Sequence, residues 1–292
     1  MDDESSPTDT KAVFSPDPSS PVGIFDSGVG GLSVLTAVRE LLPGEDLIYL
    51  ADQAHVPYGP RSLEQVRAFS RGIVDYLLAR DAKLIVVACN TASAAALNML
   101  RETYPEVPFV GMEPAVKPAA EGTDSGVVGV LATPATFQGE LYHRTVARFA
   151  SGVTVLQDTL PGLVEQIERG DIHTSKTRQI LEKALLPMLE KGVDRVVLGC
   201  THYPFVIPII QEIVGPEVEV IDPAPAVARQ VHRLLRSREL VNRGAAADEV
   251  HYTTTGDPAR FRELILNLTD RQAEVEALVW SDQELIPCRK RG

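Results

Sequence analysis

Residues 22–31 read Val-Gly-Ile-Phe-Asp-Ser-Gly-Val-Gly-Gly, a short apolar run followed by a glycine-rich turn. The apolar run is typical of a buried strand. Apolar residues then recur at positions 32, 34, 35, 38, 41 and 42, the spacing of one helix face, and the pattern stops at Pro43-Gly44. A strand that is apolar throughout and leads into an amphipathic helix indicates a parallel sheet with helices on both faces.

The same alternation of strand and helix continues along the chain. In the first half we expect strands at 47–50 and 84–88, a helix opening at a Ser62/Gln65 capping box, and a helix over 92–100. In the second half we expect strands at 127–131, 195–198 and 218–221, a helix over 176–191, and a final group of helix 225–237, strand 250–254 and helix 258–267. The predicted fold class is α/β, with mainly parallel sheets flanked by helices.

The two halves place similar motifs at similar distances. One predicted strand ends at Asp26 and another near Cys89, 63 residues later; in the second half the strands that end at Thr133 and Cys200 are 67 residues apart. This spacing indicates two pseudo-symmetric lobes, each with a cysteine at the carboxyl end of a parallel strand, where such sheets bind ligands. The active site is then expected in the cleft between the lobes. The alternative explanation of this spacing is that any α/β protein repeats strands and helices at some interval, without a duplication.

Composition excludes several classes of protein. The formal net charge of −12 argues against a nucleic-acid partner, because a phosphate backbone would repel the chain. No apolar run is long enough to cross a membrane, and the first residues lack the features of a secretory signal. We therefore expect a cytoplasmic protein without membrane association.

The three cysteines, Cys89, Cys200 and Cys288, are too few and too widely spaced for a disulfide framework. A metal site built from Cys89, Cys200 and His202 would lack any short-range ligand pair, so no metal is predicted. Cys288 lies beside a basic C-terminal run and is interpreted as incidental. A single buried cysteine is more often an inert small hydrophobe, but two cysteines in matching positions favour a function.

Two thiols that face each other across a cleft suit inversion of a stereocentre. One thiolate removes the α-proton on one face while the other thiol delivers a proton on the opposite face. The α-proton of an amino acid is on the order of 15 pK units less acidic than a thiol, a gap of roughly 20 kcal/mol, so fixed dipoles in a water-poor site must assist. The negatively charged Asp26 side chain suits the binding of the positively charged α-ammonium of the substrate. Neutral donors for the carboxylates are expected from Ser27, Asn90, Thr91, Thr133, Thr136 and Thr201.

Other interpretations of these residues stay open. His202 lies two positions after Cys200 and could tune its thiol or shuttle a proton, or could be an ordinary buried histidine. A Cys/His hydrolase would use thiolate attack on an acyl carbon but leaves Cys89 unexplained. The turn at Gly28-Gly31 could bind a small anion or be a tight turn without a ligand; Ser33 departs from the dinucleotide-binding pattern.

Six ordered motifs between Val22 and Leu268 carry a resemblance to the glutamate racemases of the aspartate/glutamate racemase superfamily. They are residues 23–31, Ala51-Asp52 with Val56-Pro57-Tyr58-Gly59, Ala88 to Ala92, Gly111 to Ala115, Thr133 to Thr136, and Gly199 to Pro204. The resemblance implies an enzyme that interconverts L- and D-glutamate without a cofactor such as pyridoxal phosphate, and that supplies D-glutamate for peptidoglycan. It also implies that a homodimer is possible.

The resemblance further assigns roles to residues. It implies that Cys89 removes the α-proton of D-glutamate and Cys200 that of L-glutamate. It places Asp52 near the first thiol and Glu168 near the second, with Asp26 and His202 assisting. The residues implied to bind substrate are Asp26, Ser27, Tyr58, Gly59, Asn90, Thr91, Thr133, Thr136, Thr201 and His202.

With the C-terminal helices returning to the first lobe, as the resemblance implies, the chain divides into four parts. Residues 1–21 are expected to be a disordered leader, 22–115 with 224–270 the first lobe, 116–223 the second lobe, and 271–292 a C-terminal tail. The sequence departs from the family at Leu160-Pro161, where many members have Cys-Pro. Aspartate or hydantoin racemase is the nearest alternative activity. A sensor, or a binding protein like the relatives reported to inhibit DNA gyrase, is the alternative outside the enzymes.

Overall fold

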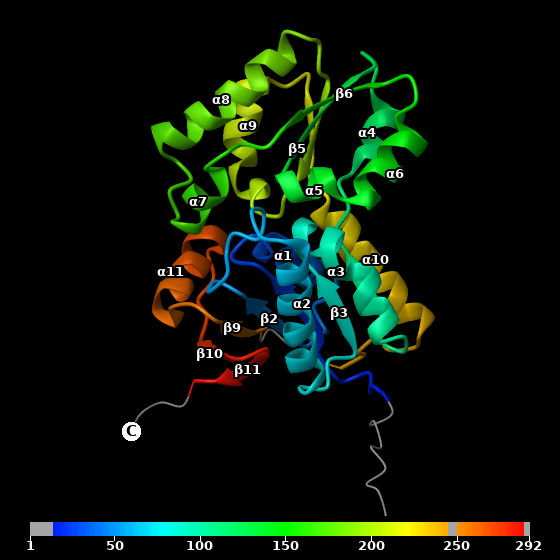
Figure 1. The fold of residues 1–292 in the computed structure, drawn as a ribbon, viewed down its shortest axis with the longest axis vertical. Coiled ribbons are helices and arrows are strands. Elements are labelled where there is room, and N and C mark those ends of the chain that lie inside the picture. The colour runs from blue at the N-terminus through cyan, green and yellow to red at the C-terminus, as the bar shows by residue number, and fades with distance from the viewer. Residues whose placement is uncertain (1–13, 245–249, 289–292) are drawn as a thin grey trace, which may run out of the picture.

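A computed structural model describes residues 14–244 and 250–288, and shows two α/β lobes stacked along the long axis of the molecule (Figure 1). The first lobe begins with β1 (Val22–Asp26), α1 (Leu32–Leu41), β2 (Leu47–Ala51), α2 (Leu63–Leu78), β3 (Leu84–Val87), α3 (Asn90–Thr103) and β4 (Phe109–Gly111). The capping box expected at Ser62 and Gln65 is present at the start of α2. The predicted α/β class is confirmed.

The chain then enters the second lobe and later returns. The second lobe contains α4 (Val116–Gly122), β5 (Val127–Ala132), α5 (Pro134–Gln138), α6 (Glu140–Phe149), β6 (Thr154–Asp158), α7 (Leu163–Glu168), α8 (Ser175–Leu189), β7 (Arg195–Gly199), the 3-10 helix η1 (Tyr203–Val206), α9 (Ile207–Val214) and β8 (Glu219–Ile221). The returning segment forms α10 (Ala224–Ser237), β9 (Val250–Thr254), α11 (Pro258–Thr269), β10 (Val275–Ser281) and β11 (Glu284–Pro287). In Figure 1, α10 and α11 lie on the first lobe, and α10 packs along α1.

The two sheets share one strand order. Within the described residues, the first sheet runs β11-β10-β9-β2-β1-β3-β4 and the second runs β6-β5-β7-β8. The segments β2-β1-β3-β4 and β6-β5-β7-β8 are equivalent, and every pair within them is parallel. Because corresponding strands occupy corresponding places, the strand ends after β1 and β3 match those after β5 and β7.

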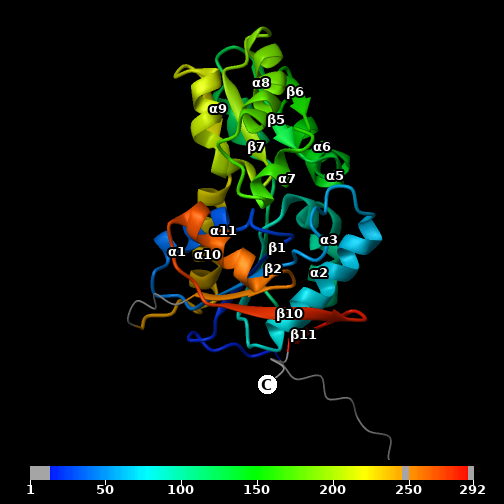
Figure 2. The same cartoon turned by 90° about the vertical axis from the view of Figure 1, so that its left-hand side faces the viewer.

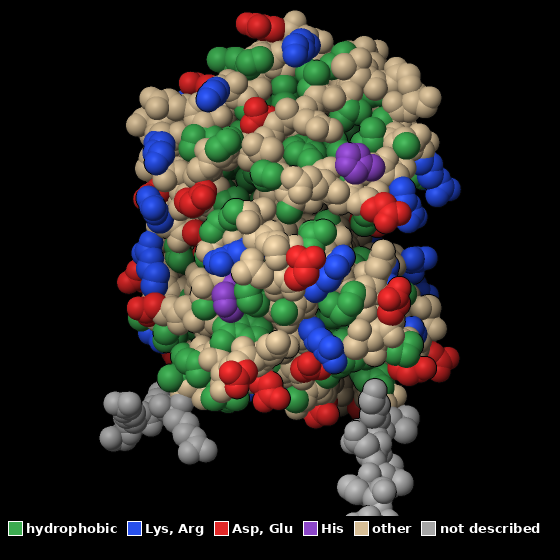
Figure 3. All heavy atoms as spheres, viewed as in Figure 1, with side chains coloured by type: hydrophobic (Ala, Val, Ile, Leu, Met, Phe, Trp, Pro, Cys, Tyr) green, Lys and Arg blue, Asp and Glu red, His purple; other side chains and the backbone are tan. Residues whose placement is uncertain are grey.

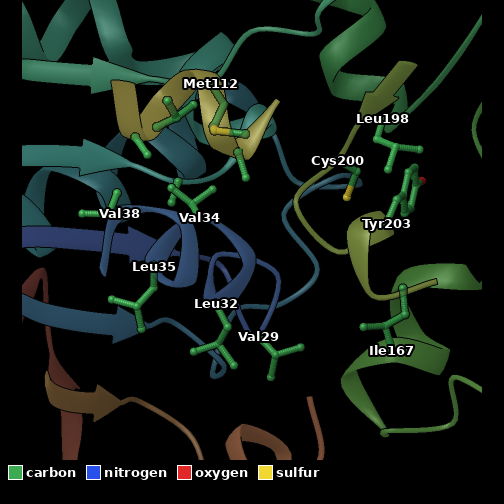
Figure 4. Packing of buried hydrophobic residues seen from close by; sticks show 14 of the residues in the cluster. Val29, Leu32, Val34, Leu35, Val38, Met112, Ile167, Leu198, Cys200 and Tyr203 are labelled. Carbon is green, nitrogen blue, oxygen red and sulfur yellow. The ribbon is translucent and has the colours of Figure 1, made fainter. Parts of the chain in front are cut away.

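A hydrophobic cluster continues from one lobe to the other. It joins residues of the first lobe such as Val29 and Leu32 to Ile167, Leu198 and Tyr203 of the second (Figure 4). Burial of each large apolar side chain contributes about 1.5–3 kcal/mol to stability, so the contact between the lobes is part of the folded core. Two smaller clusters cover the remaining faces of the sheets.

Two parts of the chain differ from the expectation. The segment predicted as a C-terminal tail contains β10, which pairs parallel to β9, and β11, which pairs antiparallel to β10, so it extends the first sheet (Figure 2). Of the predicted disordered leader, residues 1–13 lie outside the described residues. Residues 14–21 pack on the first lobe: Phe14 contacts its core, and the carbonyl of Pro21 accepts a hydrogen bond from the Lys83 amide. Apolar contact and backbone pairing hold both segments in place.

Lys, Arg, Asp and Glu side chains are interspersed over the face seen in Figure 3, on both lobes. None of the described helices combines the length and the apolar character needed to span a bilayer.

Candidate active site between the lobes

A cavity of about 540 Å³ lies between the lobes, at the carboxyl ends of their central strands. Its walls include residues that follow β1 and β3 in the first lobe and β5 and β7 in the second. Of the residues predicted to act there, those that line it are Ser27, Tyr58, Gly59, Cys89, Asn90, Thr91, Thr133, Cys200, Thr201 and His202. The strand ends that match in the two halves of the sequence therefore meet at one cavity.

Cys89 is the residue immediately before α3, with its thiol 3.9 Å from the Ser27 hydroxyl. Its side chain is buried, and burial together with the nearby Asp26 carboxylate raises the pKa of the Cys89 thiol well above its ordinary value. The amide of Ala92, in the first turn of α3, acts in the opposite direction and lowers this pKa. Cys89 is thus held mainly as a thiol, with a helix N-terminus placed to favour the thiolate when it forms.

Asp26 is fully buried behind the cavity wall. Its Oδ2 accepts hydrogen bonds from the amides of Gly31 at 2.9 Å and Gly28 at 3.3 Å, and the Thr201 hydroxyl donates to Oδ1 at 3.5 Å. Burial raises the pKa of Asp26, whereas His202 lowers it. The carboxyl group therefore lies between the two thiol regions and ties the first lobe to the second.

Cys200 has a different environment from Cys89. Its Sγ lies 3.7 Å from Nδ1 of His202, and Nε2 of that ring lies 2.6 Å from Oε1 of Glu168. Burial would lower the pKa of His202, but hydrogen bonds to Cys200 and Glu168 raise it well above its ordinary value. Glu168 does not line the cavity; it lies behind His202, holds the ring beside the Cys200 thiol and favours its protonated form.

The glycine-rich turn after β1 uses its amides for the protein's own carboxylates. The Val29 amide donates to Oε1 of Glu168 at 2.8 Å, while the amides of Gly28 and Gly31 donate to Oδ2 of Asp26. A Cβ on Gly28 would overlap the Glu168 carboxylate, and one on Gly30 would overlap the His202 ring. The glycines are therefore required for close approach of the lobes. These amides already donate to Asp26 and Glu168, so the protein's own carboxylates take the place of the small anion considered for this turn.

Neutral donors connect the lobes at another wall of the cavity. The hydroxyls of Thr91 and Thr133 lie 2.9 Å apart, and Thr133 is 3.0 Å from the hydroxyl of Thr136, which does not itself line the cavity. Asn90 is 3% exposed, and neither polar atom of its amide has a hydrogen-bond partner among the described residues. A buried amide without a partner is costly, so Asn90 is suited to bind a ligand that supplies both a donor and an acceptor.

Asp52, which the resemblance places near the first thiol, lies behind the cavity wall rather than in it. It is fully buried, does not line the cavity, and accepts a hydrogen bond of 2.6 Å from the hydroxyl of Tyr58, which does line it. Burial, and then the Asp52 carboxylate, raise the pKa of Tyr58 well above its ordinary value. The structure therefore shows Asp52 holding the wall beside Cys89 through Tyr58.

Several further residues line the cavity although the sequence motifs assign them no role in the site. They are Pro57, Pro60, Arg61, Ser62, Leu63, Pro134, Ala135, Gln138, Thr159, Leu160, Pro161, Gly162, Val164, Glu165 and Tyr203. Leu160, at the departure from the family pattern, is buried in a left-handed conformation with φ of 45° and supplies an apolar wall. Most of these residues reach the cavity through loops or short helices that only the tertiary fold brings together.

Comparisons with known proteins identify relatives of this chain. A family model described as Asp/Glu/Hydantoin racemase matches residues 31–231. A glutamate racemase of Roseiflexus sp. (strain RS-1) is 52% identical over 249 residues, which cover 85% of this chain and 92% of that relative. A glutamate racemase of Pseudomonas paraeruginosa is 49% identical over 268 residues, covering 92% of this chain and 97% of that relative.

Solved structures show the same similarity. The crystal structure of glutamate racemase isoform RacE1 from Bacillus anthracis has a TM-score of 0.82 at 31% identity, covering 91% of this chain and 98% of that one. Escherichia coli glutamate racemase, in complex with L-glutamate and the activator UDP-MurNAc-ala, has a TM-score of 0.74 at 34% identity, with 87% and 96% covered. The chain belongs to the Asp/Glu/Hydantoin racemase family, within the group formed by the glutamate racemases.

Proposed function

We propose that this protein interconverts L- and D-glutamate by transfer of the α-proton between two cysteines. The observation that carries the proposal is that Cys89 and Cys200, from matching strand ends of the two lobes, line one cavity. Cys89 acts as the base toward D-glutamate and Cys200 as the base toward L-glutamate, with the opposite thiol as the acid. Solved glutamate racemases in complex with D-glutamate, from Francisella tularensis, and with L-glutamate, from Escherichia coli, support this choice of substrate.

Each thiol receives help suited to its surroundings. The N-terminus of α3 stabilises the Cys89 thiolate, and protonated His202, held by Glu168, stabilises that of Cys200. Asp26 balances the α-ammonium, which must stay protonated to acidify the α-carbon. Exclusion of water as the cleft closes over glutamate lets these fixed charges act in a low effective dielectric, which a barrier of roughly 20 kcal/mol requires.

Substrate carboxylates are bound by neutral donors in this proposal. Asn90, Thr91 and Thr201 face one carboxylate, and Ser27 with the Tyr58-Gly59 segment faces the other; Thr133, supported by Thr136, closes the wall. The buried, unpartnered amide of Asn90 supports its assignment.

We place the enzyme in the cytoplasm, where its product D-glutamate serves peptidoglycan synthesis, and we propose a homodimer as its assembly. Sedimentation of the purified protein at several concentrations tests the assembly. A mass of one chain at all of them would contradict the dimer.

The activity is tested with L-glutamate in deuterium oxide, following circular dichroism and the α-hydrogen signal together. We expect loss of optical activity with incorporation of solvent deuterium, no response to added pyridoxal phosphate, and a much slower reaction with aspartate. Absence of both inversion and exchange in reduced protein would overturn the proposal.

Single-cysteine variants test the roles of the two bases. Cys89→Ala and Cys200→Ala should each abolish inversion, while the remaining thiol still exchanges the α-hydrogen of one enantiomer. Cys200→Ala should exchange D-glutamate, and Cys89→Ala should exchange L-glutamate. Inversion at a near-native rate in either variant would refute the two-base mechanism.

A further inference from the structure

The buried Asp52 carboxylate receives hydrogen bonds from three separate parts of the first lobe. Its Oδ1 accepts from the Thr255 hydroxyl, just after β9, and from Nε1 of Trp280 in β10, both at 2.8 Å. Its Oδ2 accepts from Tyr58 at 2.6 Å and lies 2.9 Å from Nδ1 of His55. Thr255 and Trp280 together occupy one oxygen, which leaves the other oriented toward Tyr58 and the cavity.

The position of Trp280 is fixed by close packing. A Cβ on Gly72 of α2 would lie only 2.7 Å from the indole ring and would overlap the carbonyl of Gln283, in the turn between β10 and β11. The rings of His55 and Phe69 also pack beside the indole, with centroids 5.4 Å and 6.0 Å from it. The indole N–H therefore has little freedom to leave the Asp52 carboxylate.

We propose that Trp280, on the C-terminal hairpin, is a positioning residue that orients Tyr58 against the bound substrate through the Asp52 carboxylate. The proposal rests on the proposed function, since it concerns the same cavity. Tyr58 lines the cavity beside Gly59, and Trp280 and Asp52 do not, so Trp280 acts only through its neighbours. The segment expected from sequence to be a tail is thereby part of the active-site support.

The kinetic test compares Trp280→Phe with wild-type protein. Phenylalanine keeps most of the aromatic packing but removes the N–H donor to a charged acceptor, so we expect KM for glutamate to rise about 3- to 10-fold, with kcat within about 2-fold. Val279→Ala, at the exposed neighbouring position of β10, is the matched control and should leave both constants unchanged. An unchanged KM in Trp280→Phe would overturn the inference.

Thr255 offers a second test that leaves the hairpin intact. Thr255→Val removes the other donor to Oδ1 and should raise KM as Trp280→Phe does, whereas Thr255→Ser keeps the hydroxyl and should restore the wild-type value. An equal KM in the Val and Ser variants would contradict the role of Oδ1. This pair remains informative if Trp280→Phe does not fold.

The chain contains a single tryptophan, so fluorescence excited selectively at tryptophan reports on Trp280 alone. Titration of wild-type protein with D-glutamate should change its emission in a saturable way, and Tyr58→Phe should remove the response. A native enzyme that racemises glutamate with no change in emission would overturn the coupling but not the proposed function. Absence of racemisation by the wild type would overturn the proposed function instead.

Discussion

The His202 ring bridges Cys200 and Glu168: Nδ1 lies 3.7 Å from the sulfur and Nε2 lies 2.6 Å from the carboxylate. The same carboxylate accepts the Val29 amide from the other lobe. One carboxylate thus orients the ring, favours its protonated form and contacts the backbone of the other lobe. The environment of the second thiol therefore depends on both lobes being in contact.

Glu168→Gln should lower the pKa of His202, because the hydrogen bond to the carboxylate helps to raise it. If protonated His202 supports Cys200, activity is lost as pH rises through this pKa. The basic limb of the pH profile of kcat/KM should then move to lower pH in the variant. Profiles of both proteins in the same buffers check the shift, and superimposable basic limbs would contradict it.

The same pair makes a prediction about stability. A histidine whose pKa is higher in the folded than in the unfolded protein stabilises the fold below the unfolded value, about 6.5, and this contribution disappears as pH rises through the folded value. Relative to wild type, Glu168→Gln should therefore be most destabilised near about pH 6 and least above the raised pKa of His202. Thermal unfolding across this range measures the difference; a deficit that grows with pH would have the wrong sign.

Gly30→Ala should impair the active site more than the fold. Its Cβ would lie 2.6 Å from the Thr201 hydroxyl and would overlap the His202 ring, so the lobes would have to separate. Overpacking of this kind costs about 1–3 kcal/mol, and we expect kcat/KM to fall by at least about 10-fold. Gly44→Ala is the control, because its nearest contact is an ordinary 3.4 Å. Near-native kcat/KM in Gly30→Ala would argue against the close approach.

Lys83 and Glu45 form a buried ion pair of 2.5 Å at the amino ends of the strands, opposite the cavity. Lys83→Met leaves an uncompensated buried carboxylate and should cost about 3–5 kcal/mol of unfolding free energy. Adding Glu45→Gln should recover part of this loss, and kcat/KM under native conditions should change little in either variant. Urea denaturation and steady-state kinetics test both claims; no recovery in the double variant would exclude unpaired charge as the cause.

The parts of the fold that could be predicted were those with local signals. The apolar strand runs, the Ser62/Gln65 capping box and the spacing of Cys89 and Cys200 all depend on residues close in sequence or repeated at a regular interval. The β10–β11 hairpin was missed because its pattern is weak and its partner strand β9 is separated from it by α11.

The support of the site was predictable only in part. The resemblance to the glutamate racemases placed Asp52 near the first thiol, but it did not indicate that the partners of Asp52 include Thr255 and Trp280, about 200 residues further along the chain. Likewise, the glycine-rich turn indicated either a small-anion site or a tight turn without a ligand, and only the fold shows that the turn packs closely against His202 and Glu168. Interactions of this kind depend on long-range placement rather than on local pattern.

Of the described residues that line the cavity, Arg61 alone carries a permanent positive charge, in a chain of net charge −12. Its Nε donates to the His55 carbonyl at 3.2 Å, which holds the side chain at this wall. Because glutamate carries a net negative charge, Arg61→Gln should raise KM about 3- to 10-fold with little change in kcat, and should weaken the dependence of kcat/KM on ionic strength. Arg67→Gln, outside the cavity but also bonded to a backbone carbonyl, is the matched control. Equal salt dependence in wild type and Arg61→Gln would show that neutral donors alone attract the substrate.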